Sequence, residues 1–93
     1  MEFITNPSDL WLKVVELIKK SINQQIYKTW FEPIKFISFE NYVIKLSVPN
    51  IFFKEWIEKR YLSFIISNIE YILNKSVDVE FIISNIEEEK EIN

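Results

Sequence analysis

The fold is decided by the stretch Val48-Pro49-Asn50-Ile51-Phe52-Phe53-Lys54-Glu55-Trp56, where an apolar strand ends and the longest amphipathic stretch begins. Pro49 has no backbone N–H to donate to a neighbouring strand, so it suits the last position of a strand better than the middle. Asn50 is a favoured N-cap, since its side-chain oxygen can accept a hydrogen bond from a backbone N–H of the first helical turn. The stretch therefore predicts a strand that ends near Pro49 and a helix capped by Asn50.

Two adjacent phenylalanines follow the cap. Neighbouring helix positions point about 100° apart, so Phe52 and Phe53 cannot both lie at the centre of one buried stripe. Phe53 begins a series of apolar positions at helical spacing that continues through Trp56 and Tyr61. We expect Phe53 to face the core and Phe52 to face solvent, although the reverse assignment stays open. This junction is the best candidate in the sequence for a contact site.

Upstream of the junction, apolar residues recur with a period of two, which is typical of β-strands. The runs 34–39 and 42–48 are rich in β-branched and aromatic residues, and Glu40-Asn41 lies between them as the expected turn. In the second run one face carries Tyr42, Ile44, Leu46 and Val48. The pattern predicts a β-hairpin with one buried face.

Two helices are predicted before the hairpin. Asn6 is the expected N-cap of the first, with Pro7 at its first helical position. The run Ser21-Ile22-Asn23-Gln24 resembles a capping box that opens the second helix. This helix should end near Glu32, because Pro33 disfavours helical geometry in the residue before it.

Downstream of the junction, the long helix should continue to about Asn74. A third strand is then predicted, because Val77, Val79, Phe81 and Ile83 alternate with Asp78 and Glu80. These two acids most simply form the solvated side of a sheet. The order of elements is ααββαβ, so we predict an α+β domain with a three-stranded sheet packed with helices.

The heptapeptide Phe-Ile-Ile-Ser-Asn-Ile-Glu occurs twice, at 64–70 and at 81–87. Identical strings have the same local propensity, so the flanking residues must decide their structure. The first copy continues the helical series, whereas the second follows a Val-Asp-Val-Glu alternation. We therefore predict helix for the first copy and a strand end plus tail for the second. The flanks differ, so we interpret the duplication as chance and not as a structural repeat.

Composition limits the chemistry of this 93-residue chain, which has no cysteine, no histidine and no glycine. Disulfides and thiolate metal sites are excluded, and the commonest metal ligand and general base is missing. Glycine-dependent phosphate loops and GxxG nucleic-acid clamps are excluded as well. The sequence offers no nucleophile–base pair, so we expect no enzymatic activity, no metal and no cofactor.

Charge is distributed unevenly along the chain. Residues 87–91 read Glu-Glu-Glu-Lys-Glu, whereas residues 1–86 hold ten acidic and ten basic side chains. A neutral body argues against a module held on nucleic acid by phosphate contacts. The N-terminus does not have the pattern of a signal peptide, and the uncharged runs are too short to span a membrane. We expect a soluble, cytoplasmic protein with one domain at 1–84 and the start of an acidic linker at 85–93.

Three motifs in order give the chain a family resemblance. They are Leu10-Trp11, then Tyr27-Lys28-Thr29-Trp30-Phe31-Glu32-Pro33-Ile34, then Val48-Pro49-Asn50-Ile51-Phe52 followed by Trp56 and Tyr61. Over roughly residues 8–83 the chain resembles the N-terminal domain of the bacterial replication initiator DnaA. The resemblance implies a KH-like ααββαβ fold. It also implies that the ATP site and the domain that binds origin DNA lie outside these residues.

The resemblance implies a role in protein–protein interaction: weak self-association, recruitment of the replicative helicase and docking of initiation regulators. Trp11 matches an aromatic position linked to self-association. Ile26 matches a position linked to helicase and regulator contact, where some relatives carry an acidic residue. Asn50, Phe52 and Phe53 match positions implicated in helicase or regulator binding.

Simpler structural roles compete with these assignments. Trp30 and Trp56 lie within apolar stripes, so we expect them to pack in the core. Trp11 suits the core and an interface equally, and Asn50 is first of all a helix cap. Tyr27 reads as a partly buried ring. An alternative function is a KH-like domain that binds single-stranded nucleic acid weakly through exposed aromatic rings.

Overall fold

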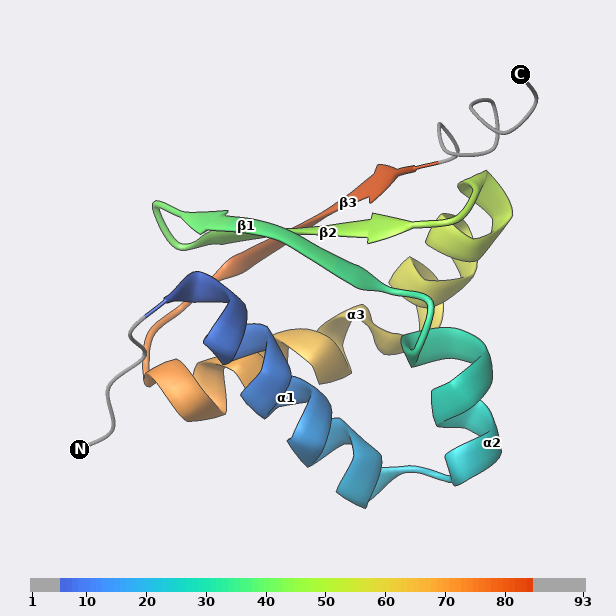
Figure 1. The fold of residues 1–93 in the computed structure, drawn as a ribbon, viewed down its shortest axis with the longest axis horizontal. Coiled ribbons are helices and arrows are strands. Elements are labelled where there is room, and N and C mark those ends of the chain that lie inside the picture. Colours follow the sequence, from blue (N-terminus) through green and yellow to red (C-terminus); the bar gives the residue numbers. More distant parts are fainter. Residues whose placement is uncertain (1–5, 85–93) are drawn as a thin grey trace.

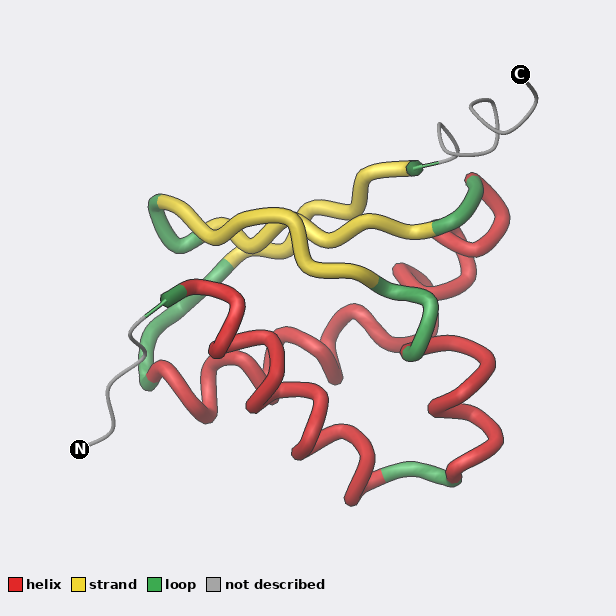
Figure 2. The backbone as a smooth tube through the Cα atoms, viewed as in Figure 1, coloured by secondary structure: helices red, strands yellow, loops and turns green. Residues whose placement is uncertain are grey.

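The computed structural model describes residues 6–84 of the chain. The elements follow the order α1 (Pro7–Ser21), α2 (Gln24–Ile26), the π-helix η1 (Tyr27–Phe31), β1 (Lys35–Glu40), β2 (Val43–Val48), α3 (Ile51–Leu73) and β3 (Asp78–Ile83). The strands form one layer, and the helices lie on one side of it (Figures 1 and 2). The predicted α+β class and the ααββαβ order are confirmed, with η1 continuing the second helix.

The sheet has the strand order β1-β2-β3, which places β2 in the centre. β1 pairs with β2 antiparallel, as a hairpin requires, and β2 pairs with β3 parallel. A parallel neighbour needs a long crossover connection, and α3 supplies it. On the central strand, Ile44, Leu46 and Val48 are fully buried. The sheet therefore has the single buried face that the alternation predicted.

The core lies between this face and the helices α1 and α3. It contains fifteen buried apolar side chains, and among the described residues no buried side chain is polar or charged. α1 contributes Leu10, Trp11, Val14 and Ile18, and α3 contributes Phe53, Ile57, Ile65 and Ile69. The helices thus have narrow buried stripes, and other apolar residues of both helices are only partly buried against the core.

Both ends of α3 are fixed by asparagine. The Asn50 side-chain oxygen accepts a hydrogen bond of 2.8 Å from the Phe53 backbone N–H, which confirms the predicted cap. At the other end Asn74 adopts the left-handed conformation, with φ of 61°. Its N–H donates to the Glu70 carbonyl oxygen at 2.7 Å. The Glu70 carboxylate also accepts from the Val77 N–H at 3.1 Å, which ties α3 to the segment leading into β3.

The hairpin turn lies one residue later than predicted. The turn residues are Asn41 and Tyr42, both with positive φ, instead of Glu40 and Asn41. A two-residue hairpin turn with two positive φ values matches the right-handed twist of the strands. Asn41 tolerates this conformation well, but a tyrosine gives no sequence signal for it. As a result Tyr42 leaves the buried face and packs edge-on against Phe39.

The starts of the first two helices also differ in detail from the prediction. Asn6 is the N-cap of α1 by position, but its side-chain oxygen accepts from the Ser8 hydroxyl and from no backbone N–H. The second helix is capped by Asn23, whose oxygen accepts from two backbone N–H groups at 2.6 and 3.3 Å. Ser21 is still inside α1, where its hydroxyl donates to the Leu17 carbonyl oxygen. The expected capping box is therefore wrong.

The duplicated heptapeptide adopts two structures. Residues 64–70 lie inside α3, whereas residues 81–83 belong to β3. The prediction for the two copies is confirmed as far as residue 84, and the rest of the second copy lies outside the described residues, as does the expected acidic linker at 85–93. Between residues 6 and 84, none of the helices is both long and apolar enough to cross a membrane.

Candidate functional site

The junction between β2 and α3 exposes two adjacent apolar residues. Phe52 is 77% exposed and Ile51 is exposed beside it, whereas Phe53 is 9% exposed and lies in the core. The cap bond from the Phe53 N–H to Asn50 fixes the first turn of α3, and this sets the direction of both rings. The predicted inward Phe53 and outward Phe52 are confirmed.

One helical turn after Phe52 on α3 lies Trp56, which stacks on Trp30 of η1. The rings of Trp30 and Trp56 are nearly parallel, with their centroids 3.6 Å apart, and Phe53 packs against Trp30 at 5.1 Å. Both tryptophans are half-buried and pack against the core, so the expected core packing is confirmed, but part of each ring is exposed. Each covers the edge of the core with one part of its ring and presents the rest to solvent. We call the residues Trp30, Ile51, Phe52 and Trp56 the junction surface.

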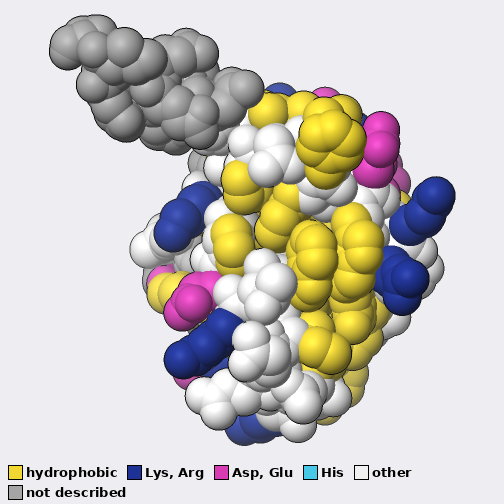
Figure 3. All heavy atoms as spheres, turned by 90° about the vertical axis from the view of Figure 1, so that its right-hand side faces the viewer, with side chains coloured by type: hydrophobic (Ala, Val, Ile, Leu, Met, Phe, Trp, Pro, Cys, Tyr) yellow, Lys and Arg dark blue, Asp and Glu magenta, His cyan; other side chains and the backbone are white. Residues whose placement is uncertain are grey.

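Basic groups border the junction surface. The Arg60 guanidinium lies 5.3 Å from the centroid of the Trp56 ring, within the range of a cation–π contact. Lys59 is exposed one turn beyond Trp56, and Lys54 pairs with Glu58 at 3.3 Å. On the face that includes the start of α3, hydrophobic side chains gather in a band, with both basic and acidic side chains beside it (Figure 3). An apolar surface with a charged edge is suited to contact with another protein.

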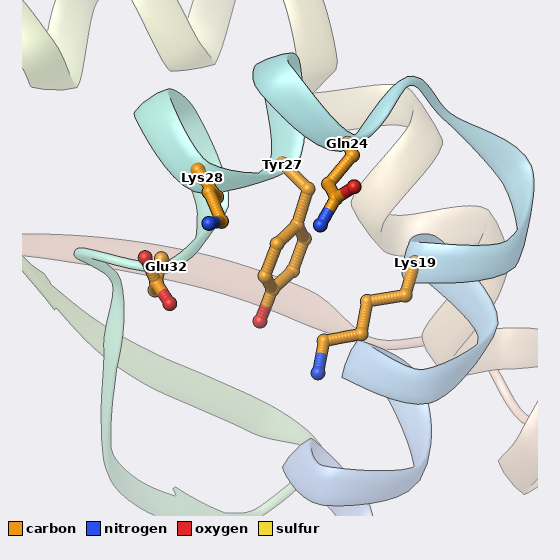
Figure 4. A pocket seen from close by; sticks show the side chains of 5 residues that line it. All are labelled: Lys19, Gln24, Tyr27, Lys28 and Glu32. Atoms are coloured by element: carbon orange, nitrogen blue, oxygen red, sulfur yellow. The ribbon is translucent and has the colours of Figure 1, made fainter.

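A second feature is a hollow of about 350 Å³ lined by Lys19, Gln24, Tyr27, Lys28 and Glu32. The Tyr27 ring stands between the end of α1 and η1, with its hydroxyl pointing away from η1 (Figure 4). The Lys19 ammonium lies 5.2 Å from the ring centroid. Burial raises the pKa of Tyr27, and the nearby Glu32 carboxylate raises it further. The phenol thus stays neutral at neutral pH.

The structure places the sequence-predicted site residues in two different settings. Asn50, Phe52 and Phe53 come together at the junction, with Phe53 supporting the surface from within. Ile26 is half-buried at the end of α2, immediately before the π-helix that carries Trp30. Trp11 is 5% exposed, so the choice left open for it resolves in favour of the core.

Sequence reasoning missed three features. Leu12, at 61% exposure, is the outward apolar residue of α1 in place of Trp11. The solvent-facing parts of Trp30 and Trp56 were also missed, since their apolar spacing indicated burial. The hollow beside Tyr27 could have been suspected from the sequence, because Lys19 and Lys28 lie on either side of the turn between α1 and α2. Within residues 6–84 no cluster of acidic side chains is arranged to hold a metal ion.

Comparison with known proteins gives a consistent family. The DnaA N-terminal domain model matches residues 8–70, which is more than half of the chain. The chain is 35% identical over 80 residues to the chromosomal replication initiator protein DnaA of Thermodesulfovibrio yellowstonii, covering 86% of this chain and 18% of that protein. It is 38% identical over 84 residues to the DnaA of Geotalea daltonii, covering 87% of this chain and 19% of that protein.

The chain thus spans about a fifth of the length of the curated relatives that it matches. Among solved structures, the fold resembles a chain in the crystal structure of a HobA–DnaA (domain I-II) complex from Helicobacter pylori. The TM-score is 0.68 at 18% identity, over 81% of this chain and 98% of that chain. At that identity the likeness establishes the fold alone. The match over residues 8–70 shows that the chain belongs to the family of DnaA N-terminal domains.

Proposed function

We propose that the domain is a protein-interaction module of a replication initiator and that its partners dock on the junction surface. The observation that carries this proposal is the 77% exposure of Phe52 on a rigid, capped helix start, beside a half-buried tryptophan pair. A large exposed ring on a fixed backbone loses little conformational entropy when a partner covers it.

The composition of the junction surface supports this role. Residues that dominate binding energy at interfaces are enriched in tryptophan, tyrosine and arginine, and they cluster where water is excluded on binding. Trp56 and Arg60 already contact each other at 5.3 Å, so a partner would meet a preorganised pair. Phe52 would supply the anchor that enters a pocket on the partner.

Family membership suggests which partners to test. The relatives are chromosomal replication initiators, and the structural neighbour was solved as a complex with HobA. We propose the replicative helicase and a regulator of initiation as partners of the junction surface, in the cytoplasm. Weak self-association through α1 is a separate proposal; the exposed Leu12 would carry it, since Trp11 is buried. Neither role requires catalysis or a cofactor.

The alternative function, weak binding of single-stranded nucleic acid, has less support. Base stacking needs a free ring face. Trp30 and Trp56 stack on each other, and Tyr27 stacks on Phe31 while Lys19 lies over its ring. The most exposed rings, Phe52 and Tyr71, lie at opposite ends of α3 and form no continuous stacking platform. A salt titration against labelled single-stranded DNA tests this alternative, because tight binding that weakens steeply with salt would favour it over protein docking.

The main proposal is tested by capture of the replicative helicase of the source organism with wild type, Phe52→Ala and Tyr71→Ala. Tyr71 is a matched control, since it is 78% exposed and lies on the same helix, away from the junction. We expect Phe52→Ala to abolish capture and Tyr71→Ala to retain it, with both variants folded. Wild-type capture by Phe52→Ala would contradict the proposal.

A further inference from the structure

The described part of the chain ends beside the junction surface. The Ser84 backbone N–H donates to the Val48 carbonyl oxygen at 2.8 Å, and Ile83 lies opposite Val48 in the parallel pairing. Val48 is followed by Pro49 and by Asn50, the cap of α3. Figure 1 shows the end of β3 close to the start of α3. The described chain therefore ends near the start of α3, which carries Ile51 and Phe52.

The acidic residues beyond Ser84 are close enough in sequence to reach this surface. Glu87 follows Ser84 by three residues and Glu91 by seven. An extended chain spans at most about 3.5 Å per residue, so these carboxylates reach about 10 and 24 Å from Ser84. α3 rises about 1.5 Å per residue, so Lys59 is about 10 Å along the helix from Phe52. The segment can cover the first two turns of α3 without strain.

The chemistry of the segment complements that of the surface. Residues 85–93 read Asn-Ile-Glu-Glu-Glu-Lys-Glu-Ile-Asn, which combines four acids and one base with two isoleucines. At about 100° per residue, positions 52, 56, 59 and 60 of α3 lie on one side of the helix. That side presents an apolar patch followed by Lys59 and Arg60. Within residues 6–84 the ion pair of this region joins Lys54 to Glu58, Lys59 shares a hollow with Glu55 and Glu58, and the Arg60 guanidinium lies over the Trp56 ring.

We propose that the acidic segment 85–93 docks on the junction surface of its own chain, with its carboxylates toward Lys59 and Arg60 and Ile86 toward Phe52. Tethering gives such a segment an effective concentration in the millimolar range, so a weak contact is populated without any partner. A helicase or regulator must then displace the segment. This regulatory consequence rests on the proposed function of the junction surface, whereas the contact itself does not.

The contact is tested without any partner by comparing amide spectra of the 93-residue chain and its Glu88→Gln/Glu89→Gln variant. We expect the variant to shift the amide signals of Phe52, Trp56 and Lys59. Raising salt to about 1 M, where the Debye length is about 3 Å, should produce the same shifts in wild type. The shifts should not depend on protein concentration, because the contact is intramolecular.

Two variants control this experiment. Asp78→Asn/Glu80→Gln removes the same number of negative charges from β3 and should leave the signals of Phe52 and Trp56 unchanged. Lys59→Gln should reduce the shifts that Glu88→Gln/Glu89→Gln produces, as expected for groups that interact directly. Shifts confined to the tail and its neighbours in β3 would overturn the proposal. Shifts that grow with protein concentration would also overturn it, by assigning the contact to a second copy.

The outcome is separable from that of the helicase experiment. If the segment docks but Phe52→Ala still captures helicase, the proposed function fails while the contact stands. If helicase binds through Phe52 but the spectra show no docking, the proposed function is supported and the proposed contact of segment 85–93 fails. If both the docking and the proposed function are correct, Glu88→Gln/Glu89→Gln should tighten helicase binding by about two- to tenfold. This range corresponds to a segment that is docked in about half to nine-tenths of the molecules.

Discussion

The two ends of α3 expose one aromatic ring each to almost the same extent, Phe52 at 77% and Tyr71 at 78%, yet their surroundings differ. Phe52 lies beside Ile51 and the stacked tryptophans. Tyr71 borders a hollow whose other lining residues are polar, namely Ser67, Glu70, Asn74, Lys75 and Ser76. A single exposed ring among polar neighbours is ordinary in a folded protein, whereas a contiguous apolar patch marks a contact site. Exposure alone therefore does not identify the site.

The largest expected effects show whether the two halves of α3 are equally well anchored. Ile57 and Ile69 are both fully buried, one in each half. Ile57→Ala and Ile69→Ala should each lower the free energy of unfolding by about 2–5 kcal/mol, because each leaves a cavity in the core. Chemical denaturation measures both. If one variant left the free energy of unfolding nearly unchanged, that half of α3 would be loosely packed. The difference between Phe52 and Tyr71 could then come from unequal packing of the two halves.

Removing a tryptophan should separate packing from docking at the junction. Trp30 is half-buried and stacked on Trp56. We expect Trp30→Ala to cost about 2 kcal/mol, below the 3–5 kcal/mol typical of fully buried large aromatics. It should also weaken helicase capture, since Trp56 and Phe53 lose the ring that packs against them. Thermal unfolding and capture can be measured on the same preparation; full stability with intact capture would remove Trp30 from the junction surface.

The helix cap should have a smaller effect. Asn50→Ala removes the acceptor for the Phe53 N–H, and should cost about 1 kcal/mol. Asn50→Asp keeps an acceptor in place and should recover most of the loss. A loss of stability well above about 1 kcal/mol would indicate that Asn50 also stabilises the change of chain direction between β2 and α3.

The smallest expected effects on stability belong to the two exposed rings themselves. Phe52→Ala and Tyr71→Ala should each change the free energy of unfolding by at most about 0.5 kcal/mol, the usual range for surface positions. Calorimetry would reveal the change as a small shift in Tm. A large loss for Phe52→Ala alone would show that its ring stabilises the monomer, and the contrast between the two ends would then concern folding instead of docking.

Much of the junction could be predicted because its determinants are local. The proline, the asparagine cap and the helical spacing from Phe53 lie within a few residues of one another, and together they fix the inward and outward rings. The heptapeptide at 64–70 and 81–87 was assigned correctly up to residue 84 for a related reason. Its flanks carry different periodicities, which are visible in the sequence.

The errors concern features that depend on tertiary structure or on unusual backbone. Tyr42 occupies a turn position with positive φ that is rare for a bulky residue, so the turn was placed one residue too early. The π-helical turn at Tyr27–Phe31 has no residue signature. Apolar spacing placed Trp30 and Trp56 in the core, but their solvent-facing parts depend on which element covers them. No neighbouring element encloses the stacked pair completely.

The two structures of the duplicated heptapeptide have a consequence for how the chain folds. Both copies follow Val48 at a distance long enough for a parallel crossover, and residues 64–66 have the same side chains as residues 81–83. The same tripeptide is therefore available to β2 at two positions as the chain collapses. Pairing with the earlier copy sacrifices the middle of α3, including the buried Ile65 and Ile69, whereas pairing with the later copy leaves the helix whole. The integrity of α3, together with the alternation of residues 77–80 before the later copy, therefore selects the native strand partner.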